Sequence, residues 1–328
     1  MPPHESQFPS SALVLDGSEL ALAELLEDVQ RYAQAGTTEG TKAAYGRYWK
    51  GFIAWADAHD AQPLPAAPQT VALFLAELAN RGLAAATLDF ALVAISRAHK
   101  RAGFDSPTSS AVLSEVRKGI RRQIGTAQDQ KAALLIEDLR RMIEALPSGL
   151  QGTRDRALLL VGFAGAFRRS ELVALKVGDV EIVSQGMRVH IRRSKTDQEA
   201  AGRIIGIPNG RAELTCPVQA LTQWLQEARI HEGPIFRGID RHGRMKPKGL
   251  TPQSVALVVK KAAKRVGLDP KRFAGHSLRS GLATSAARAG VQDRVIAQQT
   301  GHRSMKVLGR YIREGKLFEE NAAGEVGL

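Results

Sequence analysis

Near its C-terminal end the sequence carries a tyrosine, Tyr311, nine residues after His302 of a Gly-His pair. The segment HSLRSG lies upstream and contributes His276 and Arg279. A tyrosine hydroxyl, whose pKa is ordinarily about 10, becomes a nucleophile when its surroundings help it to lose its proton. Arginine forks bind charged phosphate oxygens, and histidines donate or accept protons. These residue types together indicate a site that cleaves phosphodiesters.

Two more motifs add charged residues further upstream. FRRSEL, within a predicted helix, contains Arg168 and Glu171, and RRSKTD, at a predicted hairpin turn, contains Lys195. Residues three apart share a helix face, so Arg168 with Glu171, and His276 with Arg279, can each face one pocket. The acid would orient a neighbouring cation rather than attack. A flexible lysine in a turn could reach a leaving oxygen and donate a proton.

Each motif alone also has an ordinary interpretation. An Arg-x-x-Glu pair on a helix is usually a surface salt bridge worth about 0.3 kcal/mol. A lysine in a turn is usually solvated, and a lone tyrosine after a helix is usually an amphipathic residue that packs at the surface. The shared order of arginine and acid, lysine, histidine and arginine, histidine, then tyrosine favours one site, because unrelated surface features would rarely reproduce it.

Composition sets the broad class. The chain has 328 residues, 44% of them apolar and 5% aromatic, which suits two helical domains. Its net charge is +13, but residues 1–30 carry −6, residues 31–130 carry +4 and residues 131–328 carry +15. This distribution favours a polyanionic partner for the body of the protein. The single cysteine, Cys216, excludes an internal disulfide and a cysteine-based zinc cluster, and is expected to be buried.

The first part of the chain is predicted to be helical. Apolar residues recur at helical spacing, and an aromatic stripe that includes Trp49 and Phe52 is expected to lie in a core. The predicted helices cover 18–34, 38–59, 69–79, 87–102 and 109–123. Residues 1–30 form an acidic segment expected to be partly disordered, and 31–125 form a helical domain.

The stretch RQIGTAQDQKAA lacks an apolar period, so it predicts a linker over 126–132 and a second domain over 133–328. That domain is expected to contain one long apolar helix over 154–175. Between about 180 and 208, GMRVHIRR alternates and a polar turn precedes RIIGIP, which predicts a β-hairpin. Everything after Cys216 is predicted to be helical. The expected class is mainly α with a small antiparallel β-sheet.

Together these motifs resemble the tyrosine recombinases of the phage integrase family, with the Cre-like recombinases as the nearest branch. The resemblance covers nearly the whole chain. It rests on TKAAYGRYWKGFIAWADAHD and SSAVLSEVRKGIRR in the first domain, and on RDRALLLVGFAGAFRRSELVALKVGDVE, VHIRRSKT and GHSLRSGLATSAARAGVQDRVIAQQTGHRSMKVLGRYIRE in the second. It implies a helical, SAM-like core-binding domain and a catalytic domain that form a C-shaped clamp around duplex DNA.

The resemblance also implies roles for the motif residues. Tyr311 would form a 3′-phosphotyrosyl link, and Lys195 would protonate the leaving oxygen. His276 would assist the proton of the tyrosine, and Glu171 would brace the pocket. The residues expected to hold the phosphate oxygens are Arg168, Arg279 and His302. His302 takes a place held by histidine in many members and by tryptophan in Cre. Neither a metal nor a nucleotide cofactor is expected, since the phosphotyrosine conserves the bond energy.

The expected partner is duplex DNA with an inverted-repeat recombination site. Such enzymes act as homotetramers on DNA through a Holliday junction, exchange a C-terminal helix between protomers, and would be monomers or weak dimers when free. The sequence does not indicate whether an accessory directionality protein takes part. No secretory signal or membrane span is apparent, so a cytoplasmic protein at bacterial, phage, plasmid or mobile-element DNA is expected. The candidate DNA contacts in the first domain are Lys42, Arg47, Arg81, Lys100, Arg101, Lys118, Arg121 and Arg122.

Two other functions fit parts of the sequence. A type IB topoisomerase would share the pocket chemistry, but would relax DNA without a defined site or synapsis. A non-catalytic DNA-binding regulator would use the basic surface alone, and would have no need of Tyr311 with both arginines.

Overall fold

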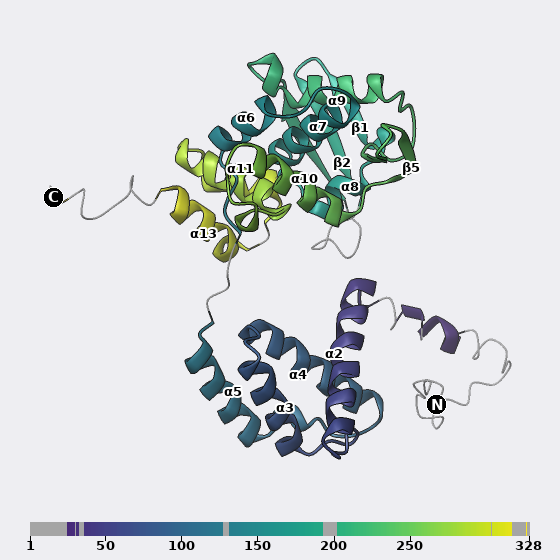
Figure 1. The fold of residues 1–328 in the computed structure, drawn as a ribbon, viewed down its shortest axis with the longest axis vertical. Helices are drawn as coiled ribbons and strands as arrows, with labels where there is room; N and C mark the ends of the chain where they lie inside the picture. The colour runs from purple at the N-terminus through teal and green to yellow at the C-terminus, as the bar shows by residue number, and fades with distance from the viewer. Residues whose placement is uncertain are drawn as a thin grey trace. The chain divides into compact units, whose positions relative to one another are not determined.

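The chain forms two compact units, Met1–Asp129 and Gln130–Leu328, each with its own apolar core (Figure 1). The division falls inside the segment 126–132, where a linker is expected. The computed structural model describes residues 25–29, 31–32, 36–126, 131–192, 202–302, 304–316 and 326. No helix among these residues is long and apolar enough to cross a membrane.

In its described part, the first unit is built from the helices α2 (Glu39–Ala58), α3 (Pro68–Asn80), α4 (Ala85–Arg101) and α5 (Ala111–Ile124). Each lies within two residues of a predicted helix. Of the helix predicted over 18–34, residues 25–29 and 31–32 are helical and the rest falls outside the described residues. Thr38 and Ser110 begin α2 and α5 by accepting a hydrogen bond from a main-chain amide in the first turn.

The core of the first unit lies between these four helices. Phe52 of α2 is fully buried and meets Phe74 of α3 with ring centroids 5.2 Å apart. Trp49 and Trp55 are partly buried against the same cluster, so the aromatic stripe of α2 faces inward as predicted. Contacts join α2 to α4 and α3 to α5, which gives a small helical bundle whose outer faces carry the charged residues.

The second unit is mainly helical with a small three-stranded antiparallel sheet, and the predicted class is confirmed. Strand β2 pairs with both neighbours, and Arg203 at the start of β3 lies opposite Ile191 at the end of β2. The helices are α6 (Ile136–Glu144), α7 (Leu150–Ala164), α8 (Arg169–Ala174), α9 (Pro217–Glu227), α10 (Pro252–Arg265), α11 (His276–Arg288), α12 (Asp293–Thr300) and α13 (Met305–Gly315). The sheet strands are β1 (Val180–Val183), β2 (Gly186–Ile191) and β3 (Arg203–Pro208).

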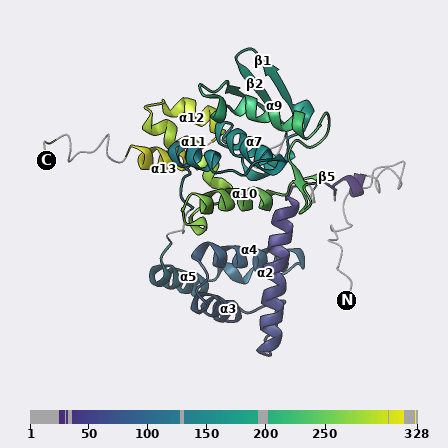
Figure 2. The same cartoon turned by 45° about the horizontal axis from the view of Figure 1, so that its top comes forward.

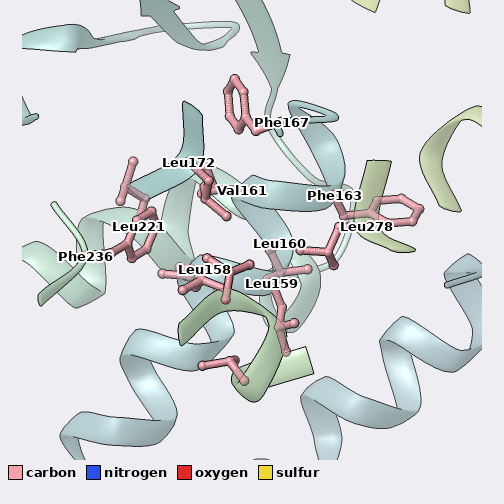
Figure 3. Packing of buried hydrophobic residues seen from close by; sticks show 14 of the residues in the cluster. Leu158, Leu159, Leu160, Val161, Phe163, Phe167, Leu172, Leu221, Phe236 and Leu278 are labelled. Carbon is pink, nitrogen blue, oxygen red and sulfur yellow. The ribbon is translucent and has the colours of Figure 1, made fainter. Parts of the chain in front are cut away.

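Helix α7 is the centre of the second unit. Leu158, Leu159, Leu160 and Val161 are all buried although they point to different sides of the helix. Figure 3 shows them among side chains from several other elements, including Leu221 and Leu278. A helix that is apolar on all faces has to be covered on all faces. The helices α6, α8, α9, α10 and α11 all contact α7 and cover it.

Two predictions for the second unit are wrong. The single helix expected over 154–175 is interrupted, because α7 ends at Ala164 and α8 begins at Arg169. Ala166 has a φ of 47°, and the ring of Phe167 lies so close to Gly165 that a side chain there would overlap with it. The chain also returns to strand after Cys216, as the short hairpin of β4 (Arg237–Ile239) and β5 (Met245–Gly249). Cys216 itself is buried, as expected.

Helices α11, α12 and α13 lie side by side at one edge of the second unit (Figure 2). Between them is a small apolar cluster that is separate from the main core. Its buried members are Ala283, Ala287, Ile296, Leu308 and Ile312, and Tyr311 packs against it.

Candidate active site

Arg168 and Glu171 form an ion pair at the start of α8. Because the chain turns before α8, Arg168 is the residue that precedes the helix, not a residue inside it. Its amide donates to Glu171 Oε2 at 3.0 Å and its Nη1 donates to Glu171 Oε1 at 2.6 Å. The Glu171 side chain is only 1% exposed, whereas that of Arg168 is 18% exposed. The buried acid thus fixes the direction of an arginine that still reaches the surface.

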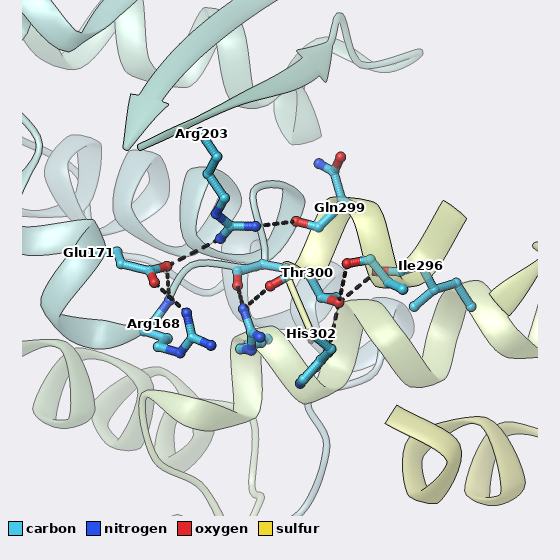
Figure 4. A network of polar contacts seen from close by, with 10 residues as sticks. Arg168, Glu171, Arg203, Ile296, Gln299, Thr300 and His302 are labelled. Carbon is cyan, nitrogen blue, oxygen red and sulfur yellow. Dashed lines mark hydrogen bonds and ion pairs between the residues drawn. The ribbon is translucent and has the colours of Figure 1, made fainter. Parts of the chain in front are cut away.

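Arg203, which the sequence motifs did not single out, binds the same acid from β3. Its Nη2 lies 3.5 Å from Glu171 Oε2, and its Nη1 donates to the main-chain oxygen of Gln299 at 3.4 Å. Burial lowers the pKa of Arg203, and Glu171 opposes that effect. The only sequence feature that could have indicated Arg203 is its position directly after the predicted polar turn. Figure 4 shows how Arg203 connects Glu171 to the end of α12.

Arg279, on the first turns of α11, is the most deeply buried cation of the site, at 1% exposure. Its Nη1 donates to the main-chain oxygen of Ala166 at 2.9 Å and also to that of Thr300. Among the described residues, its buried Nη2 has no hydrogen-bond partner. Burial, with a smaller effect of Arg168, lowers the pKa of Arg279 to about 10, so it remains cationic at neutral pH. A buried cation with an unused donor is suited to binding an anion.

Tyr311 on α13 faces His276 at the start of α11. The Tyr311 hydroxyl and His276 Nε2 are 2.9 Å apart, within hydrogen-bond distance. Burial raises the pKa of Tyr311, and the charge of Arg279 partly offsets the rise. His276 keeps an exposed edge, but partial desolvation of its ring and then the charge of Arg279 lower the pKa of His276. The pair is therefore a protonated phenol next to a neutral imidazole, which is the arrangement needed for proton transfer from Tyr311.

His302 also lies close to Tyr311, with ring centroids 6.0 Å apart. Its Nδ1 is 2.7 Å from the hydroxyl of Thr300, a buried residue that the sequence motifs did not indicate. Burial, followed by the charges of Arg279 and Arg168, lowers the pKa of His302 to about 4.

The structure thus brings six of the seven predicted site residues together: Arg168, Glu171, His276, Arg279, His302 and Tyr311. Lys195 lies outside the described residues. Two strands flank its segment. Strand β2 ends before it at Ile191, and strand β3 begins after it at Arg203, which lies beside Glu171.

The candidate DNA contacts of the first unit lie on several helices. Lys42 pairs with Glu39 at 2.7 Å, Arg81 with Glu77 at 3.9 Å, and Arg121 with Asp89 at 3.6 Å. All but Lys42 are exposed. The side chains lie on α2 (Lys42, Arg47), at the end of α3 (Arg81), at the end of α4 (Lys100, Arg101) and on α5 (Lys118, Arg121, Arg122).

A hollow between α2 and α4 brings two of these candidates together. Lys42 and Arg101 line it with Tyr45 and Arg97, whose guanidinium lies 5.2 Å from the Tyr45 ring centroid. Arg97 was not among the predicted contacts, although its position one helical turn before Arg101 places both on one face of α4. The described part of the first unit therefore has a basic, partly aromatic surface on these helices.

Comparison with known proteins identifies the family. Residues 133–316 match the model of the phage integrase family. The chain is 39% identical to an integrase/recombinase XerD homologue of Selenomonas ruminantium, over 89% of this chain and 87% of the other. It is 26% identical to the recombinase Cre of Escherichia phage P1, over 92% of both chains. Because the XerD homologue is the more similar of the two, the expectation of a specifically Cre-like branch gains no support.

A solved structure shares the fold. The XerH site-specific recombinase, crystallised with its palindromic difH substrate in a post-cleavage complex, aligns with a TM-score of 0.57 at 19% identity, over 79% of this chain and 71% of the other. With the sequence matches and the pocket around Tyr311, the outcome is plain: the chain belongs to the phage integrase family of tyrosine recombinases, enzymes that transfer DNA strands.

Proposed function

We propose that the protein is a site-specific recombinase that cuts and rejoins duplex DNA through a covalent link to Tyr311. The observation that carries the proposal is the Tyr311 hydroxyl, 2.9 Å from His276 Nε2, at a site where buried Arg279 has a donor with no partner among the described residues. A phosphodiester bound there would supply the missing acceptor for Arg279. It would also lie near the N-terminus of α11, where the helix dipole favours an anion.

The reaction then follows from the positions of these groups. Tyr311 Oη attacks phosphorus as its proton passes to His276, so that a bond forms between Oη and phosphorus. The bond from phosphorus to the 5′ oxygen breaks, and Lys195 supplies the proton that turns this oxygen into a hydroxyl. The 3′ phosphate remains on the enzyme. Attack by the 5′ hydroxyl of a partner strand reverses each transfer and releases Tyr311.

Arg168 and Arg279 would stabilise the charge that develops on the non-bridging oxygens, because both are cationic and aimed by fixed partners. Glu171 would keep Arg168 in place, and Arg203 would keep Glu171 in place, without either touching the phosphate. His302 would complete the set of phosphate ligands.

The first unit would hold the DNA. Its basic residues, with Arg97 added to the predicted set, suit phosphate contacts along α2 and α4. We further propose that the two units close around the duplex as a clamp and that four protomers assemble on two inverted-repeat sites. Strand exchange would pass through a Holliday junction, with the segment after α13 docked on a neighbouring protomer. The XerH relative, which was crystallised with a palindromic substrate, is consistent with a symmetric site.

The test is covalent capture on DNA. Sites are first recovered by selecting bound fragments, and a selected duplex is nicked beside the mapped cleavage point so that the released strand end is lost. The wild-type protein should accumulate a 3′ adduct, whereas Tyr311→Phe should bind the duplex equally well and form none. An adduct in that variant would rule out Tyr311 as the nucleophile. Relaxation of supercoiled plasmids that lack the site, without exchange between sites, would favour a topoisomerase.

A further inference from the structure

The hydroxyl of Thr300 lies at the end of α12, between the helix and the ring of His302 (Figure 4). Thr300 is fully buried. Its Oγ1 is 2.6 Å from the main-chain oxygen of Ile296, 3.4 Å from that of Ala297 and 2.7 Å from Nδ1 of His302. Its own main-chain oxygen accepts from Arg279. One residue thus contacts two groups of the active site.

Counting protons determines the direction of the bond to His302. Two oxygens 2.6 Å apart form a short O–H···O hydrogen bond, and without a proton between them they would repel. The carbonyl of Ile296 has no proton, so the single proton of the Thr300 hydroxyl must lie there. Thr300 Oγ1 can then only accept from His302, which means that His302 Nδ1 carries a proton.

A neutral imidazole has one N–H, so a proton on Nδ1 leaves a lone pair on Nε2. Neutral His302 is consequently an acceptor at Nε2. It repels a phosphate oxygen there, because that oxygen is also an acceptor. Only the imidazolium, with protons on both nitrogens, can donate from Nε2.

The surrounding charges oppose that imidazolium in the free protein. Burial disfavours a positive charge on His302, and so do the charges of Arg279 of α11, Arg168 before α8 and Arg203 of β3. Its other titratable neighbours, His276 and Tyr311, are neutral. A bound phosphate brings negative charge to the centre of these groups, and it would favour a proton on His302.

We propose that Thr300 is a positioning residue that holds neutral His302 with its proton on Nδ1, so that His302 can donate to a phosphate oxygen only after a second proton binds at Nε2. The second half rests on the proposed function, because it assumes that the pocket binds phosphate. Phosphate binding at this site is then coupled to uptake of one proton, and the imidazolium becomes available as a donor only when the anion is present.

The first test examines the free protein and needs no DNA. Full-length protein labelled with ¹⁵N in histidine is studied by NMR at neutral pH, and His302→Gln identifies the resonances of His302. In the wild type, Nδ1 should have the shift of a protonated nitrogen and Nε2 that of an unprotonated one. Thr300→Val keeps the shape but removes the acceptor, and should move the tautomer ratio toward Nε2–H by about fivefold, the typical effect of one neutral hydrogen bond. Thr300→Ser should keep the wild-type ratio.

A wild-type His302 protonated at Nε2 would overturn the proposal, as would a Thr300→Val ratio identical to that of the wild type. Inorganic phosphate is then titrated at the same pH. Wild-type His302 should gain its second proton as phosphate binds. The Thr300→Val variant should bind phosphate with less uptake of protons at His302. A shift of His276 with His302 still neutral would refute the coupling. A titration that moves neither histidine would contradict phosphate binding in the pocket, and therefore the proposed function, while the tautomer result still decides the role of Thr300.

Discussion

Gly301 separates Thr300 from His302, and its replacement by alanine should reveal how strongly Arg203 supports the active site. Gly301 has a φ of +65° and a ψ of 41°, a left-handed conformation that ends α12. A β-carbon at this position would overlap with Nη1 of Arg203. Alanine would therefore strain the backbone and also push the guanidinium away from Glu171 and Gln299.

The size of the effect follows from these two terms. A left-handed conformation costs an L-residue about 1–2 kcal/mol. Displacing Arg203 loses two long hydrogen bonds, worth about 0.5–1.5 kcal/mol each. Gly301→Ala should then destabilise the second unit by about 2–5 kcal/mol. Arg203→Met, which loses the same two hydrogen bonds, should cost about 1–3 kcal/mol alone. Because methionine no longer opposes the methyl group, the double variant should fall short of the sum by about 1–3 kcal/mol.

Gly290 provides a matched control. It has a φ of +72°, but a β-carbon there would meet no atom within 4 Å. Gly290→Ala should therefore pay only the backbone cost of about 1–2 kcal/mol, and it should add to Arg203→Met without coupling. The difference between the two glycine variants isolates the contact with Arg203.

Urea unfolding measures these free energies. The chain has three tryptophans, and a background with Trp49→Phe and Trp55→Phe leaves Trp224, which is buried in the second unit, as the fluorescent probe. Midpoints should shift while the denaturant slope stays constant. Additivity of Gly301→Ala and Arg203→Met within about 0.5 kcal/mol would refute the steric argument, as would equal effects of the two glycine variants.

Three further predictions concern chemistry, pH and DNA. Lys195→Ala should slow adduct formation far more than it weakens binding, and a 5′-thio leaving group, which needs no proton, should restore cleavage; failure of the rescue would exclude lysine as the general acid. The pKa of His302 is about 4 in the folded protein and about 6.5 in the unfolded chain, so the unfolded chain binds the proton first as the pH falls. The free energy of unfolding should therefore fall as pH drops from about 6.5 to about 4. The full shift would correspond to roughly 3 kcal/mol, which partial exposure reduces to about 1–2, and a urea series over this range should be flatter for His302→Gln. Lys118→Ala and Arg122→Ala, on exposed positions of α5, should each reduce the slope of log K against log salt by about 1, whereas unchanged slopes would exclude phosphate contacts there.

The helices of the first unit could be predicted because each has a continuous apolar face. The aromatic stripe that contains Phe52 repeats every three or four residues, and α2 begins and ends within one residue of the prediction. The hairpin of β4 and β5 could not be predicted, because MKPKG has no alternating pattern. The break before Arg168 was not predicted either. The apolar run of α7 continues through the buried Phe167, so the sequence pattern does not change where the helix ends.

The active-site motifs were visible because nucleophile, acid and cation types recur at short spacing. Arg203 and Thr300 were not, because neither belongs to a motif of that kind. Arg203 acquires its role only where β3 meets the end of α12, almost a hundred residues later in the sequence, and Thr300 contacts Arg279 only where the end of α12 meets α11. Partners of this kind are fixed by tertiary contacts, which local periodicity does not encode.

The separate apolar cluster beneath Tyr311 has a consequence for motion. Its five buried side chains include two alanines, so α13 gains much less from burial than α7 does from the main core. The free energy that opens α13 locally is therefore smaller than the free energy that unfolds the unit, and its amide hydrogens should exchange with solvent faster than those of α7. Tyr311 is therefore expected to leave and rejoin the site more readily than the arginines that would bind the phosphate.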